Sequence, residues 1–98
     1  MRILFLVKKE NYSKASDIVF KNDLLSRQSI NFRDSKSLGL GGDIYYLDIQ
    51  GSDEAIEEAK GLLKDVSTEV TGKDKEKVIE VIEKQEEAAN AGFGSIFG

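Results

Sequence analysis

The chain has 98 residues, of which 33% are charged and 40% hydrophobic, and its formal net charge at pH 7 is −4. This length and composition predict one small globular domain. Because cysteine and histidine are both absent, disulfides, thiol catalysis, thiolate metal sites and imidazole bases are excluded. The acidic excess lies in the second half of the chain, which argues against general nucleic-acid binding, since that needs clustered Lys and Arg.

A strand is predicted from the apolar run RILFLVK near the start of the chain. Ile3, Phe5 and Val7 alternate with Leu4 and Leu6, so both faces of this strand are apolar and we expect it in the centre of a sheet. The run lacks the features of a signal peptide, and no apolar stretch approaches the roughly 20 residues that span a bilayer. We therefore expect a cytoplasmic protein without membrane partners.

A helix is predicted over residues 13–26, with Ser13 as its N-cap. The loop that precedes it is the candidate ligand site, because its two lysines lie where an anionic ligand could sit against the helix. Exposed lysines that only raise solubility are the alternative. The candidate ligand-binding residues are Lys8, Lys9, Asn11, Tyr12 and Ser13.

Two further strands are predicted over residues 29–33 and 43–50, joined by the glycine-dense run LGLGGD. Phosphate-binding glycine loops lead from a strand into a helix, whereas this run leads from one strand into another. We interpret it as a hairpin connector whose glycines supply positive φ angles. A loop whose backbone meets a ligand or a partner is the alternative.

The clearest helix follows Ser52, a predicted N-cap with two acidic residues in the first turn behind it. Gly61 lies inside this helix, where a close approach of the helix to the sheet would explain it. A short strand over residues 67–72 and a third helix over about 74–91 come next. Residues 92–98 are predicted to form a flexible tail of glycine and apolar residues. The alternative is that Phe93, Ile96 and Phe97 dock into a groove on a neighbouring subunit or partner.

The predicted order is β-α-β-β-α-β-α, so the fold class is α+β. Its first six elements match a ferredoxin-like βαββαβ sandwich with a four-stranded antiparallel sheet, here with an additional C-terminal helix. Residues 1–91 would form this single domain. Right-handed crossovers place the first and third strands in the centre and the two short strands at the edges.

Two helices cover only one face of such a sheet, and the second face is also apolar. The third helix, a second copy of the protein, or both would cover it. The candidate interface residues combine the second face with the apolar tail; they are Leu4, Leu6, Ile44, Tyr46, Phe93, Ile96 and Phe97.

No catalytic residue, metal ligand or cofactor is predicted. The paired carboxylates Glu54/Glu58 and Glu83/Glu87 have helical i,i+4 spacing, and no loop has EF-hand spacing, so we interpret them as solvated surface. Aromatic residues that stack on RNA bases are accompanied by basic residues, whereas Tyr46 shares its strand face with Asp48. Nucleic-acid binding is therefore not expected.

The segment GDIYYLDIQGSDEAIEEAKGLLKDVSTEV, residues 42–70, resembles the NIL domain and, more loosely, the ACT domain. The similarity lies in an apolar strand that ends in Ile49-Gln50-Gly51, the spacing of Ile56, Ala59 and Leu63 in the helix, and the short strand that follows. Both families are ferredoxin-like. The resemblance implies a regulatory module that senses an amino acid, although the loop over residues 8–13 lacks the glycine that ACT ligand sites usually present.

These observations predict a non-catalytic regulatory or interaction module that self-associates as a homodimer or higher homo-oligomer and senses a small molecule such as an amino acid. The alternatives are a stand-alone binder of a small anionic metabolite and, less favoured, an RNA-binding domain.

Overall fold

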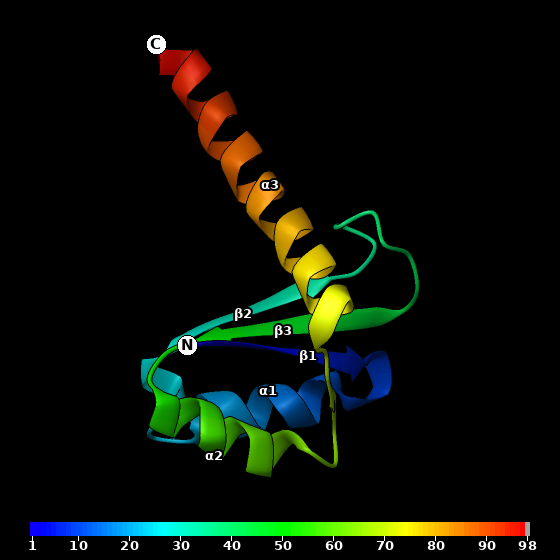
Figure 1. Cartoon of the computed structure of the whole chain (residues 1–98), viewed down its shortest axis with the longest axis vertical. Helices are drawn as coiled ribbons and strands as arrows, with labels where there is room; N and C mark the ends of the chain where they lie inside the picture. The colour runs from blue at the N-terminus through cyan, green and yellow to red at the C-terminus, as the bar shows by residue number, and fades with distance from the viewer. Residues whose placement is uncertain (98) are drawn as a thin grey trace.

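The structure is a computed structural model, and it describes the backbone of residues 1–97 and the side chains of residues 1–88. In this part of the chain the fold is α+β, with one four-stranded antiparallel sheet and three α-helices (Figure 1). The strands are β1 (Arg2–Lys8), β2 (Ser29–Asp34), β3 (Ile44–Gln50) and β4 (Thr68–Glu69). The α-helices are α1 (Tyr12–Lys21), α2 (Asp53–Leu63) and α3 (Gly72–Phe97).

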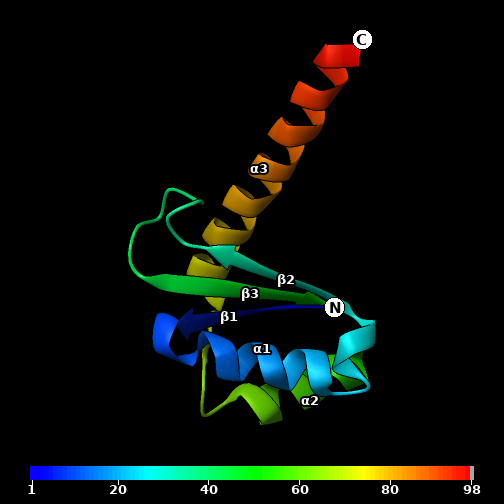
Figure 2. The same cartoon turned by 180° about the vertical axis from the view of Figure 1, so that it is seen from behind.

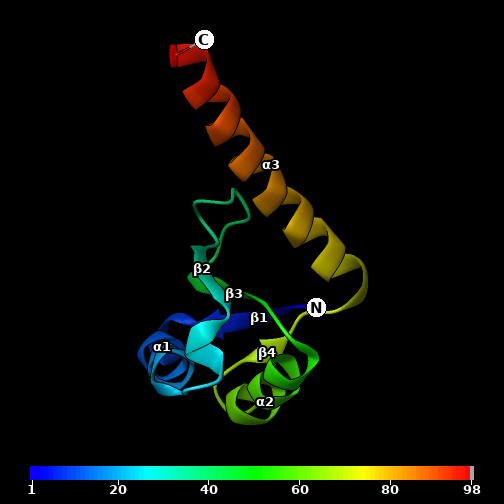
Figure 3. The same cartoon turned by 90° about the vertical axis from the view of Figure 1, so that its left-hand side faces the viewer.

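The strand order is β2-β3-β1-β4, which confirms the prediction that the first and third strands are central. Helices α1 and α2 lie side by side on one face of the sheet, and α3 lies on the other (Figures 2 and 3). The main core fills the space between the sheet and the first two helices. Its buried residues include Ile3, Phe5 and Val7 of β1, Leu47 and Ile49 of β3, and Ala55, Ile56, Ala59 and Leu63 of α2.

The two helices of this layer begin differently from one another. The hydroxyl of Ser52 accepts a hydrogen bond from the backbone N–H of Ala55 at 3.2 Å, so the predicted N-cap of α2 is confirmed. The predicted N-cap of α1 is wrong: the cap residue is Asn11, and Ser13 lies inside the first turn. A short 3₁₀ turn, Lys9–Asn11, leads directly into α1, so the cap lies two residues before the predicted one.

Helix α1 also ends sooner than the pattern predicts. Asn22 has an extended backbone conformation, and its side-chain oxygen accepts a hydrogen bond from the N–H of Leu25 at 2.9 Å. This local bond competes with the next helical turn. A separate 3₁₀ turn, Leu25–Arg27, then carries the buried Leu25 into the core.

The glycine-dense run forms the connector between β2 and β3, as predicted. Gly39, Gly41 and Gly42 have φ angles of 75°, 73° and 84°, which residues with a Cβ rarely adopt. The connector folds back on the chain, since the buried Ser35 donates its hydroxyl hydrogen to the carbonyl oxygen of Gly41. This fold directs Leu38 into a second core, so part of the connector packs against the body of the protein while its glycines stay exposed.

This second core covers part of the other face of the sheet. Leu4 of β1, Leu38 of the connector, and Val78 and Ile82 of α3 are buried together there. The chain's own third helix and connector therefore cover the area around Leu4. The same helix is longer than predicted, because its trace continues past Ala91 to Phe97, through positions predicted as a tail; Gly98 lies outside the described residues.

A buried ion pair joins the second face to α3. Asp48 is only 1% exposed, and both of its carboxylate oxygens accept hydrogen bonds from the guanidinium of Arg2, at 2.9 and 2.8 Å. The same guanidinium lies 3.0 Å from Glu83 of α3. The hydrogen bonds with Asp48 raise the pKa of Arg2, and the amine of Lys75 donates to the Arg2 carbonyl at 2.9 Å.

We expect Arg2→Met to lower the free energy of unfolding by about 3–5 kcal/mol, because it leaves the buried Asp48 carboxylate unpaired. Urea denaturation measures this change. The matched control is Arg27→Met, which removes an exposed ion pair with Asp23 and should cost no more than about 1 kcal/mol. Equal losses for the two variants would contradict the importance of the buried pair.

Gly61 does not mark a close approach of α2 to the sheet, contrary to prediction, because a Cβ built there would meet no atom within 4 Å. Its φ angle is also compatible with an L side chain. We therefore expect Gly61→Ala to stabilise the protein by about 0.5–1 kcal/mol, measured as a shift in the denaturation midpoint. As a control, Gly39→Ala should destabilise the protein, because Gly39 has a positive φ angle. A loss of stability in Gly61→Ala would refute the conclusion that there is room for a methyl group at Gly61.

Candidate binding groove

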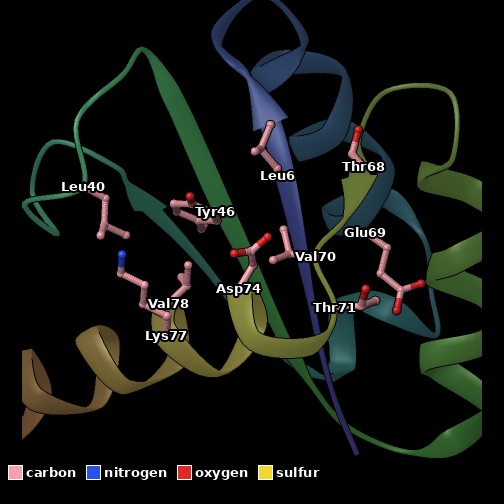
Figure 4. A pocket seen from close by; sticks show the side chains of 10 residues that line it. All are labelled: Leu6, Leu40, Tyr46, Thr68, Glu69, Val70, Thr71, Asp74, Lys77 and Val78. Atoms are coloured by element: carbon pink, nitrogen blue, oxygen red, sulfur yellow. The ribbon is translucent and has the colours of Figure 1, made fainter.

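An open groove of about 440 Å³ lies on the second face of the sheet, beside the first turns of α3 (Figure 4). It is built from four parts of the chain: the central strands, the segment around β4, the connector and α3. The lining residues are Leu6, Leu40, Tyr46, Thr68, Glu69, Val70, Thr71, Asp74, Lys77 and Val78.

The floor of the groove follows from strand register. Leu6 pairs with Tyr46 on one side and with Thr68 on the other. Leu4 and Leu6 point to the same face because side chains alternate along a strand. Helix α3 covers Leu4, which is fully buried, but leaves Leu6 half-exposed at the groove. The groove is thus the part of the second face that α3 does not cover.

The rim of the groove is polar and carries both signs of charge. Asp74 and Lys77 come from successive turns of α3, and Glu69, Thr68 and Thr71 come from the segment around β4. An apolar floor with a few polar groups at the edge is typical of sites that bind small molecules or side chains. The arrangement suits a ligand with an apolar body and charged ends.

The described residues contain no group of three or more acidic side chains placed to hold a metal ion. Over the same residues, no helix combines the length and apolar character that a bilayer crossing requires.

The structure divides the predicted ligand residues among separate surroundings. Lys8 and Asn11 line a hollow of about 270 Å³ together with Lys64 and Ser67, so they lie near the end of α2. Lys9 lines a different hollow, of about 90 Å³, beside Asp43. The predicted loop therefore does not form one shared pocket.

The hollow beside Lys9 contains an ion pair at the two ends of the connector. The amine of Lys36 lies 2.9 Å from the carboxylate of Asp43. This hydrogen bond lowers the pKa of Asp43 and raises the pKa of Lys36. Both side chains are exposed. We therefore expect this ion pair to contribute little to the free energy of unfolding.

Tyr12 and Ser13 have different positions again. The ring of Tyr12 packs against Phe32 and Tyr45, with centroids 4.9 and 4.5 Å apart. Such aromatic pairs contribute to packing, and they hold the start of α1 against β2 and β3. Ser13 is exposed on the first turn of α1.

The predicted interface residues are also separated. Leu4 is buried beneath α3, whereas Leu6 and Tyr46 line the groove. Ile44 lies beside the hollow that contains Lys9. The side chains of Phe93, Ile96 and Phe97 lie outside the described residues, although the helical trace passes through all three positions.

Sequence reasoning did not identify the α3 side of the groove. By its spacing in the sequence, Val78 indicates only an apolar stripe of the third helix, and Asp74 and Lys77 are residue types of ordinary helix surface. One local signal was present: the third helix follows β4 after two residues, so its first turns must lie near the β4 edge. The angle at which it crosses the sheet has no local signal.

Comparison with known proteins finds no family model, no curated protein and no solved structure that matches this chain.

Proposed function

We propose that this protein is a non-catalytic regulatory or interaction module of the ferredoxin-like type, which self-associates and binds a small molecule such as an amino acid. The strand order β2-β3-β1-β4, with every neighbouring pair antiparallel, supports the ferredoxin-like assignment. The assignment is also consistent with the resemblance of residues 42–70 to NIL and ACT domains.

The groove is the observation that carries this proposal. Its volume of about 440 Å³ falls within the range of roughly 300–1,000 Å³ of small-molecule sites. An apolar amino acid would set its side chain on Leu6 and Tyr46 and its charged ends near Asp74 and Lys77. The polar residues of the rim are carboxylates, threonines and one lysine, which can form charge-assisted hydrogen bonds with the ammonium and carboxylate groups of an amino acid.

A thermal-shift screen with amino acids tests ligand binding at the groove. For a ligand that binds the folded state, Tm rises with ligand concentration relative to Kd. We expect Asp74→Asn and Lys77→Gln to reduce this rise. The matched control is Lys73→Gln, which removes an exposed lysine of α3 that does not line the groove. If no amino acid at millimolar concentration raised Tm, the sensing role would be refuted.

Light scattering coupled to size-exclusion chromatography tests self-association. The full chain should elute at the mass of a dimer or a larger oligomer at micromolar concentration. A strict monomer there would refute this part of the proposal.

The hollow beside Lys8 favours a second candidate, a binder of a small anionic metabolite. Lys8 and Lys64 both line this hollow, with Asn11, Ser67 and Thr68 as further hydrogen-bonding groups and Asp65 as a residue of opposite charge. Inorganic phosphate and citrate should raise Tm, and Lys8→Gln with Lys64→Gln should abolish the rise. Lys14→Gln, on the exposed surface of α1, is the control, and an unchanged rise in the double variant would exclude this hollow.

A further inference from the structure

Helix α3 leaves the body of the protein partway along its length. Among the described side chains, its last hydrogen bonds to the rest of the chain come from Gln85, which donates to the carbonyl oxygen of Ser37, and Glu86, whose carboxylate lies 2.5 Å from the guanidinium of Arg33. Beyond this point the helix continues away from the sheet (Figures 1 and 3). We call residues 88–98 the C-terminal arm.

The composition of the arm differs from that of the rest of the chain. It contains no charged residue, in a protein of which one third is charged. Its large residues are Phe93, Ile96 and Phe97, and its other residues are alanine, glycine, asparagine and serine. Short helices derive most of their stability from packing of an apolar face, and an uncharged segment of this composition is suited to an apolar surface.

The arm cannot reach the groove of its own chain while α3 is helical. Val78 lines the groove, and Phe93 follows fifteen positions later, about 22 Å further along the helix axis at 1.5 Å per residue. A second copy of the chain has no such restriction. Its arm can approach the groove along α3 from the opposite direction.

We propose that the C-terminal arm of a second copy occupies the groove, and that the exchange is reciprocal. The two α3 helices would run antiparallel, with Phe93 of each copy near Lys77 of the other. The midpoint between these two positions is Gln85, so the twofold axis would pass close to it. Such an arrangement fills both grooves and closes the assembly as a dimer.

This proposal rests on the proposed self-association, and the arm and the groove are the two surfaces that would meet in the dimer. The small residues of the arm, including Ala88, Ala89, Ala91 and Gly92, would allow the two helices to approach closely, and Leu6, Tyr46 and Val70 would receive the apolar side chains. Since the arm and a small ligand would occupy the same groove, ligand binding should displace the arm and favour the monomer.

Removal of the arm tests the proposal. A chain that ends at Glu87 keeps the contacts of Gln85 and Glu86 with the body, so it should retain its fold by circular dichroism and elute as a monomer. Full-length Phe93→Asp/Phe97→Asp should also be monomeric. The matched control is Phe20→Asp, which alters an aromatic residue 54% exposed on α1 and should remain a dimer.

Cross-linking tests the pairing directly, because the chain has no native cysteine. A mixture of Lys77→Cys and Phe93→Cys proteins should form a disulfide-linked heterodimer in higher yield than a mixture in which Lys60→Cys, on α2, replaces Lys77→Cys. Equal yields would overturn the antiparallel arrangement.

The outcomes separate the two proposals. A dimer that persists after deletion of the arm would overturn the arm-in-groove inference and leave self-association standing. A full-length monomer would refute both. A full-length monomer that sediments with phosphatidylcholine vesicles through Phe93 and Phe97 would instead assign the arm to a lipid surface, and would also overturn the inference.

Discussion

The structure depends on the need to cover both faces of β1. This central strand places Ile3, Phe5 and Val7 on one face and Leu4 and Leu6 on the other. Burial of each of these apolar side chains stabilises the fold, and a side chain left in water does not contribute this free energy. Helices α1 and α2 can cover only the first face. The chain covers part of the second face, around Leu4, with α3 and the connector between β2 and β3.

Helix α3 is held in position by a group of polar contacts around Arg2 as well as by apolar packing. Arg2 links the buried Asp48 to Glu83, and Lys75 bonds to the backbone of Arg2. These contacts hold α3 over Leu4, with Val78 and Ile82 beside it. Because the helix is held at this place, it does not extend over Leu6, and the groove exists for that reason. The groove and the incomplete cover of the sheet therefore have a common origin.

Local patterns were sufficient to predict most of the elements. The strands follow alternation of side chains, and α2 follows its N-cap and helical periodicity, so both are properties of consecutive residues. The start of α1 was mispredicted because the 3₁₀ turn before it has no periodic signal. The residues of the predicted ligand loop are divided in the structure. Tyr12 packs on Phe32 of β2 and Tyr45 of β3, whereas Lys8 and Lys9 line two different hollows, and none of these contacts has a signal in the local sequence.

The sequence by itself determined the α+β class, the central position of β1 and β3, the connector role of the glycines and the exclusion of cysteine and histidine chemistry. These features depend on residue type and on spacing over a few positions. Only the tertiary structure decided that α3 and Leu38 cover Leu4, that Leu6 and Tyr46 remain at an open groove, and that α3 extends beyond the body. Those features depend on the angle and position at which one helix crosses the sheet, which are set by contacts between residues far apart in the chain.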